Sequence, residues 1–206
     1  MLRFWGAKVQ RNLKFIFKVF IISLLIFATS ASQYLRTLAP FTLKKILLLS
    51  DTHSHIDESI LKYVRLADEV WHAGDIGDLK VTDTIKAIKP LRAVYGNIDD
   101  DKARLEFPLH NRFMCEGVDV WITHIGGYPG KYNQAIRAEI QRNPPKLFIC
   151  GHSHILKVQF DKSLNLLHMN PGACGIYGFH QVRTMLRFEI DGDKIQNLEI
   201  IELGKK

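Results

Sequence analysis

A short, strongly apolar run near residue 46 constrains the fold of this chain most. The run spans residues 46–49 (Ile-Leu-Leu-Leu) and ends at the polar segment 50–53 (Ser-Asp-Thr-His). A run that is both short and continuously apolar predicts a strand buried on both faces, as in a parallel sheet. Asp51 and His53 would then lie at the carboxyl end of the strand, where α/β sheets bind their ligands. Carboxylate oxygen together with imidazole nitrogen suits a divalent transition metal.

The same arrangement recurs four more times along the chain. Apolar runs at 70–73, 91–95, 118–122 and 147–150 each precede a polar segment. These segments are Gly74-Asp75, Gly96-Asn97-Ile98-Asp99, Thr123-His124 and Gly151-His152-Ser153-His154. A lone Asp-x-His is more often a helix cap beside a buried histidine, but core packing does not generate five such clusters at five strand ends. The repetition therefore favours a functional site at one edge of a sheet.

On these five motifs the chain resembles the calcineurin-like metallophosphoesterases, most closely their small bacterial and archaeal phosphodiesterase branch. The resemblance covers the chain from about Lys44 to about Glu202. It implies an α/β fold, a four-layer αββα sandwich of two mixed β-sheets flanked by helices. The order of the apolar runs agrees, because a β-α-β-α-β half is followed by a mostly antiparallel half.

The resemblance also implies a site for two divalent metals. Asp51, His53 and His154 would hold the first metal, Asn97, His124 and His152 the second, and Asp75 would bridge them. Mn²⁺ is the expected metal, with Zn²⁺, Fe²⁺ or Ni²⁺ as alternatives. Asp75, Asn97 and His124 are the expected catalytic positions, where hydroxide shared by the two metals would hydrolyse a small phosphodiester substrate.

Several other polar residues have a structural interpretation first. His72 and Asp99 are expected to support the ligands from a second layer, and His55 to be a loop residue rather than a substrate contact. The turn at Asn170 is expected to be structural support. His110, His168 and His180 have no motif context and receive no role. Gly74, Gly96 and Gly151 are expected to let the chain turn sharply where strands end.

The spacing of apolar residues predicts three helices. They begin near Asp57, near Val81 and near Tyr132, and the last two end before Pro90 and Pro144. Two hairpins are predicted, one through Glu116-Gly117 and one through Asp191-Gly192. Residues 105–124 show no helix signal.

Residues 1–42 differ from the remainder in charge. They contain six of the 28 Lys and Arg residues and no Asp or Glu, which leaves 22 basic residues against 21 acidic ones in residues 43–206. The phosphoesterase domain at 43–206 thus carries no basic surface of the kind that nucleic-acid binding needs.

The apolar stretch at 19–28 follows basic residues and precedes small ones, the order of a secretory signal. An upstream extension outside the mature protein is the alternative. The chain would meet a membrane only if residues 1–42 are retained, and it would be exported or membrane-associated if they form a signal. The cysteines Cys115, Cys150 and Cys174 show no pairing pattern and are expected to be buried free thiols, which slightly favours the cytoplasm.

Two other functions compete with phosphodiester hydrolysis. The family includes a trafficking-complex subunit, so the chain could be a non-catalytic interaction scaffold, which predicts eroded ligands. A recombination-repair type of nuclease would carry a histidine where this chain has Ile98. That position lacks a proton donor, so we expect a substrate whose leaving group needs little protonation. A homo-oligomer is compatible with the sequence.

Overall fold

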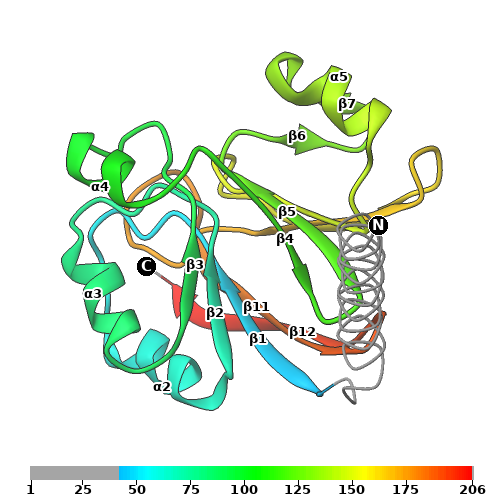
Figure 1. The fold of residues 1–206 in the computed structure, drawn as a ribbon. Helices are drawn as coiled ribbons and strands as arrows, with labels where there is room; N and C mark the ends of the chain where they lie inside the picture. Colours follow the sequence, from blue (N-terminus) through cyan, green and yellow to red (C-terminus); the bar gives the residue numbers. More distant parts are fainter. Residues whose placement is uncertain (1–41, 206) are drawn as a thin grey trace, which may run out of the picture. The chain divides into compact units, whose positions relative to one another are not determined.

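The computed structural model describes residues 42–205, which form two mixed five-stranded sheets with helices outside them (Figure 1). The predicted α/β sandwich is therefore confirmed. Residues 1–41, which hold nearly all of the basic N-terminal segment, lie outside the described residues. Within residues 42–205, no helix combines the length and the apolar character that a membrane span requires.

The first sheet has the strand order β12-β11-β1-β2-β3. Its strands are β1 (Lys44–Leu49), β2 (Glu69–His72), β3 (Leu91–Ala93), β11 (Val182–Asp191) and β12 (Lys194–Lys205). The strands β1, β2 and β3 run parallel, whereas β11 is antiparallel to both β1 and β12. The side chains of Ile46 and Leu48 enter the core between the sheets, and those of Leu47 and Leu49 enter the core under the helices. The strand is thus buried on both faces, as its apolar run predicts.

The second sheet has the order β4-β5-β8-β10-β9. Its strands are β4 (His110–Cys115), β5 (Val118–Thr123), β8 (Leu147–Ile149), β9 (Leu156–Asp161) and β10 (Leu166–Pro171). The central strands β5, β8 and β10 are parallel, and the two edge strands are antiparallel to their neighbours. The carboxyl ends of β5 and β8 therefore meet at one edge.

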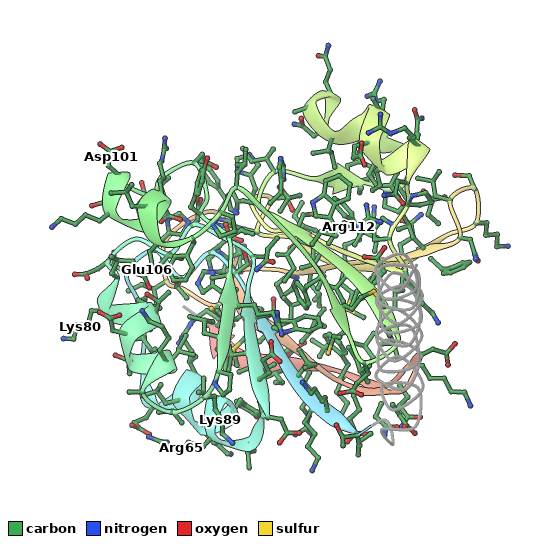
Figure 2. The ribbon with its side chains drawn as sticks, viewed as in Figure 1. Arg65, Lys80, Lys89, Asp101, Glu106 and Arg112 are labelled. Carbon is green, nitrogen blue, oxygen red and sulfur yellow. The ribbon has the colours of Figure 1, made fainter. Side chains whose placement is uncertain are left out.

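Helices cover the outer faces of the sheets. The helices α2 (Glu58–Leu66) and α3 (Lys80–Lys86) pack on the first sheet, and α5 (Gln134–Arg142) packs on the second through Ile136 and Ile140. Figure 2 shows charged side chains such as Arg65 and Lys80 pointing away from the sheet. The cysteines Cys115, Cys150 and Cys174 are free and buried, as predicted.

Two elements were not predicted. The helix α4 (Asp101–Glu106) follows β3, and Asp100 caps it by accepting a hydrogen bond from the backbone N–H of Ala103. A small hairpin, β6 (Gly127–Tyr128) and β7 (Lys131–Tyr132), precedes α5. Tyr132 belongs to this hairpin, so α5 begins two residues later than expected. Its ring packs against that of Phe148 in the same core cluster as Ile136 and Ile140 of α5.

Candidate metal centre

The predicted ligands all follow strand ends at the same edge of the sandwich. Asp51 and His53 follow β1, Asp75 follows β2, and Asn97 lies in the loop after β3. From the second sheet, His124 follows β5 and the pair His152 and His154 follows β8. The two sheets are tied here by the backbone N–H of His152, which donates to the Asp51 carboxylate at 3.2 Å. Residues as far apart as 51 and 154 thus share one site.

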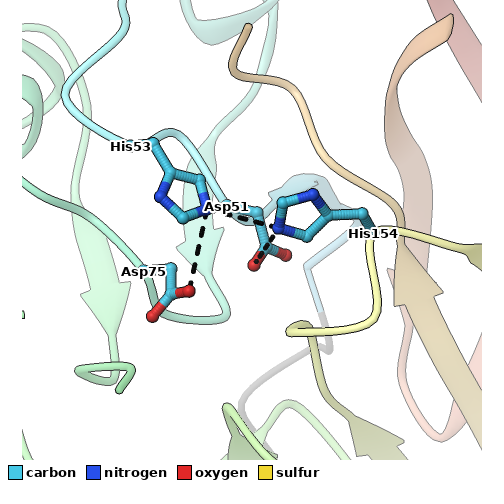
Figure 3. Close-up of side chains that lie close together, drawn as sticks. All are labelled: Asp51, His53, Asp75 and His154. Atoms are coloured by element: carbon cyan, nitrogen blue, oxygen red, sulfur yellow. Dashed lines mark hydrogen bonds and ion pairs between the residues drawn. The ribbon is translucent and has the colours of Figure 1, made fainter. Parts of the chain in front are cut away.

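Two carboxylates and two imidazoles form the first cluster (Figure 3). One potential ligand atom from each of Asp51, His53, Asp75 and His154 lies within 4.8 Å of the others. His53 Nε2 is 3.7 Å from Asp75 Oδ2, and His154 Nε2 is 3.3 Å from Asp51 Oδ1. The two imidazole Nε2 atoms lie 3.2 Å apart. Four donor atoms of the types that bind transition metals therefore converge on one small volume.

The second cluster shares Asp75 with the first. Asp75, His124 and His152 place ligand atoms within 4.8 Å of one another. His124 Nε2 lies 3.1 Å from Asp75 Oδ1 and 3.2 Å from Asn97 Oδ1. One oxygen of Asp75 thus faces His53 and the other faces His124. This is the arrangement that a bridging carboxylate between two cations requires.

The hydrogen bonding of His124 tests whether these residues suit a cation. Its Nδ1 lies 2.8 Å from the carbonyl oxygen of Ala73, which can only accept, so Nδ1 carries the proton. In the neutral imidazole, Nε2 is then a bare lone pair that faces a carboxylate oxygen and an amide oxygen. Three electron-pair donors that meet in this way need a positive charge between them, either a proton on Nε2 or a metal ion, and the donor set therefore fits a metal ion.

Burial and the carboxylates shift the pKa values of the site histidines in opposite directions. Burial alone would lower the pKa of His124, but the hydrogen bond that its ring donates to Asp75 and the charges of Asp51 and Asp75 outweigh it and raise that pKa. Burial lowers the pKa of His53 and of His152, which favours the neutral form that a metal ligand must take. The pKa of Asp75 is below its ordinary value, because contacts with His124, Ile98 N–H and His53 outweigh the effect of burial. The carboxylates thus favour positive charge at His124, whereas burial keeps His53 and His152 in the neutral form.

The backbone at the site is unusual. Nine non-glycine residues in the described part of the chain have positive φ angles, and five of them are candidate ligands. These five are Asp51 (54°), His53 (46°), Asp75 (55°), His152 (68°) and His154 (57°). The left-handed conformation costs an L-residue about 1–2 kcal/mol. Such strain collects at functional sites, where surrounding packing enforces it.

Glycines make room for the carboxylates, which corrects part of the sequence-based interpretation. Gly74 has a φ of +92° and does turn the chain, as expected. Gly96 and Gly151 have no positive φ, so turning is not what requires a glycine there. A Cβ atom on Gly96 would lie 2.1 Å from Asp75 Oδ1, and one on Gly151 would lie 2.9 Å from Asp51 Oδ2. Gly96 thus leaves room for the Asp75 carboxylate, whereas Gly151 leaves room first for the Ser50 hydroxyl, 2.0 Å from such a Cβ, and then for the Asp51 carboxylate.

Asp99 and His72 form contacts that hold the loops of the site. The Asp99 carboxylate accepts hydrogen bonds from the backbone N–H groups of Ile76, Gly77 and Gly96, at 3.2, 2.7 and 2.7 Å. These bonds join the loop after β3 to the loop that carries Asp75.

His72 is completely buried, and its Nδ1 accepts from Gly74 N–H, so its Nε2 donates to Thr52 Oγ1. Burial lowers the pKa of His72 to about 4. It contacts the glycine next to Asp75 rather than the Asp75 carboxylate.

A cavity of about 400 Å³ opens at the clusters, and it includes residues to which the sequence assigned no role. Tyr177, Phe179 and His180 line it together with Ile98, His53, Asp75 and Asn97. The His180 ring lies 5.2 Å from the His154 ring, and the Tyr177 ring lies 5.3 Å from that of His53. A weak signal was present in the segment 177–180, where a glycine separates two aromatic residues before a histidine.

Three further polar residues considered from the sequence lie outside the two clusters. His55 contacts Asp57, with 3.0 Å between Nε2 and Oδ2, and His110 contacts Thr123 Oγ1 at 2.9 Å. Asn170 donates through its amide to the carbonyl oxygen of Gly151 at 2.8 Å and to Ser153 Oγ at 3.2 Å. That contact supports the loop that bears His152 and His154.

Comparison with known families identifies the superfamily of this chain. The profile of the calcineurin-like phosphoesterase superfamily domain matches residues 45–193. The matched segment contains both clusters and most of the two sheets. The chain therefore belongs to the calcineurin-like phosphoesterase superfamily. A comparison with curated proteins found no match.

Solved structures with the same fold are distant in sequence. A novel archaeal phosphodiesterase is 21% identical, with a TM-score of 0.61 over 76% of this chain and 99% of its own. A predicted phosphoesterase from Streptococcus pneumoniae is 20% identical, with a TM-score of 0.58 over 80% of this chain and 92% of its own. Vps29 from Entamoeba histolytica, solved with Zn²⁺, is 15% identical, with a TM-score of 0.61 over 78% of this chain and 99% of its own. At these identities the likeness concerns the fold.

Proposed function

We propose that this protein is a metal-dependent phosphodiesterase that hydrolyses small phosphodiesters. The observation that carries the proposal is the sharing of Asp75 by two clusters, each rich in imidazole and carboxylate groups. Asp51, His53 and His154 would hold one cation, Asn97, His124 and His152 the second, and Asp75 both. Oxygen and imidazole ligands in this mixture suit Mn²⁺, with Zn²⁺, Fe²⁺ or Ni²⁺ as alternatives.

The residues of the chain have separate roles in this reaction. When bound, the two cations would supply an acidified water as nucleophile and neutralise charge on the phosphoryl oxygens. His124 is held by its bond to the Ala73 carbonyl so that Nε2 faces the site. The Asp99 carboxylate accepts hydrogen bonds from three backbone N–H groups and so holds the loops of Asn97 and Asp75 together. We assign it this positioning role rather than that of a general acid.

The leaving group should need little help from the protein. Ile98 lines the cavity with a side chain that is 47% exposed and has no proton to donate. General-acid catalysis is worth about 10² to 10⁴-fold, and more for basic leaving groups. Aryl phosphodiesters should therefore react fastest, and the rate should fall steeply as the pKa of the leaving group rises.

Turnover of a graded series of phosphodiesters tests the proposal. The full chain with added Mn²⁺, Zn²⁺, Fe²⁺ or Ni²⁺ would be assayed against aryl and alkyl phosphodiesters and the corresponding monoesters, together with the Ile98→His and Asp99→Asn variants. We expect hydrolysis of the aryl diesters and a shallower dependence on leaving-group pKa in Ile98→His. Absence of diester hydrolysis with each of the four metals would contradict the proposal. A flat dependence in the parent that becomes steep in Asp99→Asn would identify Asp99 as the acid.

A non-catalytic scaffold is the competing function, since Vps29 proteins have the same fold. A scaffold has no need to keep a complete ligand set, and here all seven positions hold the expected residue, five of them in strained backbone conformations. That retention favours catalysis. Metal binding alone would not distinguish the two functions, because one Vps29 was solved with Zn²⁺. Turnover is therefore the deciding measurement.

A further inference from the structure

A second cavity lies beside the metal centre. It has a volume of about 540 Å³ and extends from the His152 loop to the β6–β7 hairpin, with β9 and β10 contributing Lys157, His168 and Asn170. His152, Ser153 and Ile155 line both this cavity and the one at the metal clusters. A group held in the second cavity would therefore be next to a phosphorus atom bound at the clusters.

The two cavities differ in charge. The metal cavity has apolar walls at Ile98 and Phe179, and neither lysine nor arginine lines it. The second cavity is lined by Lys131 and Lys157. Within residues 42–205, no carboxylate oxygen lies within 4.0 Å of either ammonium nitrogen. Two cations without counter-charges make this cavity attractive to an anion.

Lys157 is held in place by its surroundings. Its Nζ lies 4.1 Å from the centroid of the Tyr128 ring, a cation–π contact that leaves the N–H donors available. On β10 its cross-strand neighbour is Asn170, whose amide supports the His152 loop. The backbone of Lys157 is thus in register with the strand that supports the His152 loop, and its ammonium group rests on the Tyr128 ring at the cavity.

His168 supplies a further, independent sign of a polar ligand. The side chain lines the cavity and is 1% exposed, and its Nδ1 has no hydrogen-bond partner among the described residues. Burial and the nearby Lys157 lower the pKa of His168 to about 4, so the ring is neutral and one nitrogen can accept a hydrogen bond. A buried, unpaired polar atom is costly and needs an explanation such as a bound group.

We propose that the second cavity binds the ester group that the phosphodiester retains, and that this group carries a carboxylate or a phosphate. This inference rests on the proposed function. The leaving group would occupy the apolar cavity at Ile98, and the retained group would extend past His152 to Lys131 and Lys157. The volume lies within the range of pockets that bind small molecules. The substrate is then an asymmetric phosphodiester, apolar at one ester and anionic at the other.

Matched p-nitrophenyl phosphodiesters test the subsite in the Mn²⁺-loaded full chain. The retained group would be ethyl, 2-carboxyethyl or 2-phosphonooxyethyl, and p-nitrophenolate leaves from each. We expect the two anionic esters to have a KM about 10-fold below that of the ethyl ester, and Lys157→Gln or Lys131→Gln to abolish that advantage. Lys157→Arg should preserve it. Lys162→Gln, in the exposed turn between β9 and β10, removes the same charge outside the cavity and serves as the control.

Binding of the products separates this inference from the proposed function. The product 2-carboxyethyl phosphate should bind more tightly than ethyl phosphate in a calorimetric titration, and the difference should vanish in Lys157→Gln. If no diester is hydrolysed but this difference is present, the proposed function fails and the anion subsite stands. Equal KM values for the charged and ethyl esters, or equal affinities for the two products, would overturn the subsite.

Discussion

Both ends of the sandwich contain non-glycine residues with positive φ angles, but these residues serve different purposes at the two ends. At the end opposite the metal centre, positive φ angles occur at Glu116 and Asn165, in the β4–β5 and β9–β10 turns. Such turns need this conformation, which asparagine, aspartate and histidine adopt more readily than most residues. At the metal end, aspartates and histidines take it, including the completely buried Asp51. The difference teaches that the same conformation reverses the chain at one end and places five candidate ligands at the other.

Removing the carboxylate of Asp75, which the two clusters share, should have the largest effect on the metal end. We expect Asp75→Asn to lose at least one cation and to reduce kcat/KM more than about 100-fold, because loss of a residue that only supports a ligand already costs 10–100-fold. Metal content by mass spectrometry and diester turnover are the measurements. Asp193→Asn, at the opposite end, is the matched control. A variant with two cations and normal turnover would show that Asp75 is not the bridge.

A methyl group on Gly96 should damage the site without changing any ligand. Its Cβ would lie 2.1 Å from Asp75 Oδ1 and 2.3 Å from Asp75 N, so the carboxylate must move. We expect Gly96→Ala to lower metal affinity and kcat/KM by about 10–100-fold. The control is Gly117→Ala in the β4–β5 turn, at the end opposite the metal centre. Its Cβ would lie 3.0 Å from Asp193 Cβ, and we expect metal affinity and kcat/KM to stay unchanged. Equal effects of the two substitutions would refute the special packing at Gly96.

Asp57 offers a smaller test, on stability and its dependence on pH. The pKa of Asp57 is well below its ordinary value, since contacts with Arg183, Ser59, Ile60 N–H and His55 outweigh the effect of burial. A depressed native pKa adds stability that is complete above the unfolded-state value, about 3.9, and is lost as the pH falls below it.

At pH 5 we therefore expect Asp57→Asn to reduce the free energy of unfolding by about 1–2 kcal/mol, since it weakens the cap of α2 and removes the ion pair with Arg183. Urea unfolding should show a smaller difference at pH 3. The control is Glu58→Gln, at an exposed position one residue along. A difference that grows towards pH 3 would contradict the sign.

The smallest effect is expected from deleting the N-terminal segment. The described chain begins at the end of β1 that is farthest from the metal centre. A chain that starts at Leu43 should be soluble, keep the unfolding midpoint of the full chain and hydrolyse diesters at the same rate. Thermal unfolding and turnover check this, and loss of folding would show that residues 1–42 belong to the domain.

The sequence predicted those features that local patterns determine. Short apolar runs ending in Asp, His or Asn placed the candidate ligands at strand ends, because burial and chain direction follow from the pattern itself. The helix α4 was missed, since it buries only Ala103 and depends on one cap at Asp100. Short helices of this kind have little periodicity to detect.

Features that depend on contacts between distant segments could not be predicted. The need for glycine at position 96 comes from Asp75 packing against it, and no neighbouring residue signals that contact. The location of His168 beside Lys157 depends on the pairing of β9 with β10. Phe179 is fully exposed, so only its place at the metal cavity gives it a functional meaning.

Anomalous diffraction from crystals of the full chain grown with Mn²⁺ tests the central claim most directly. The account predicts two anomalous peaks, one between Asp51, His53 and His154 and one between Asn97, His124 and His152, with an oxygen of Asp75 contacting each. Peaks elsewhere, or a single peak without contact to Asp75, would contradict it.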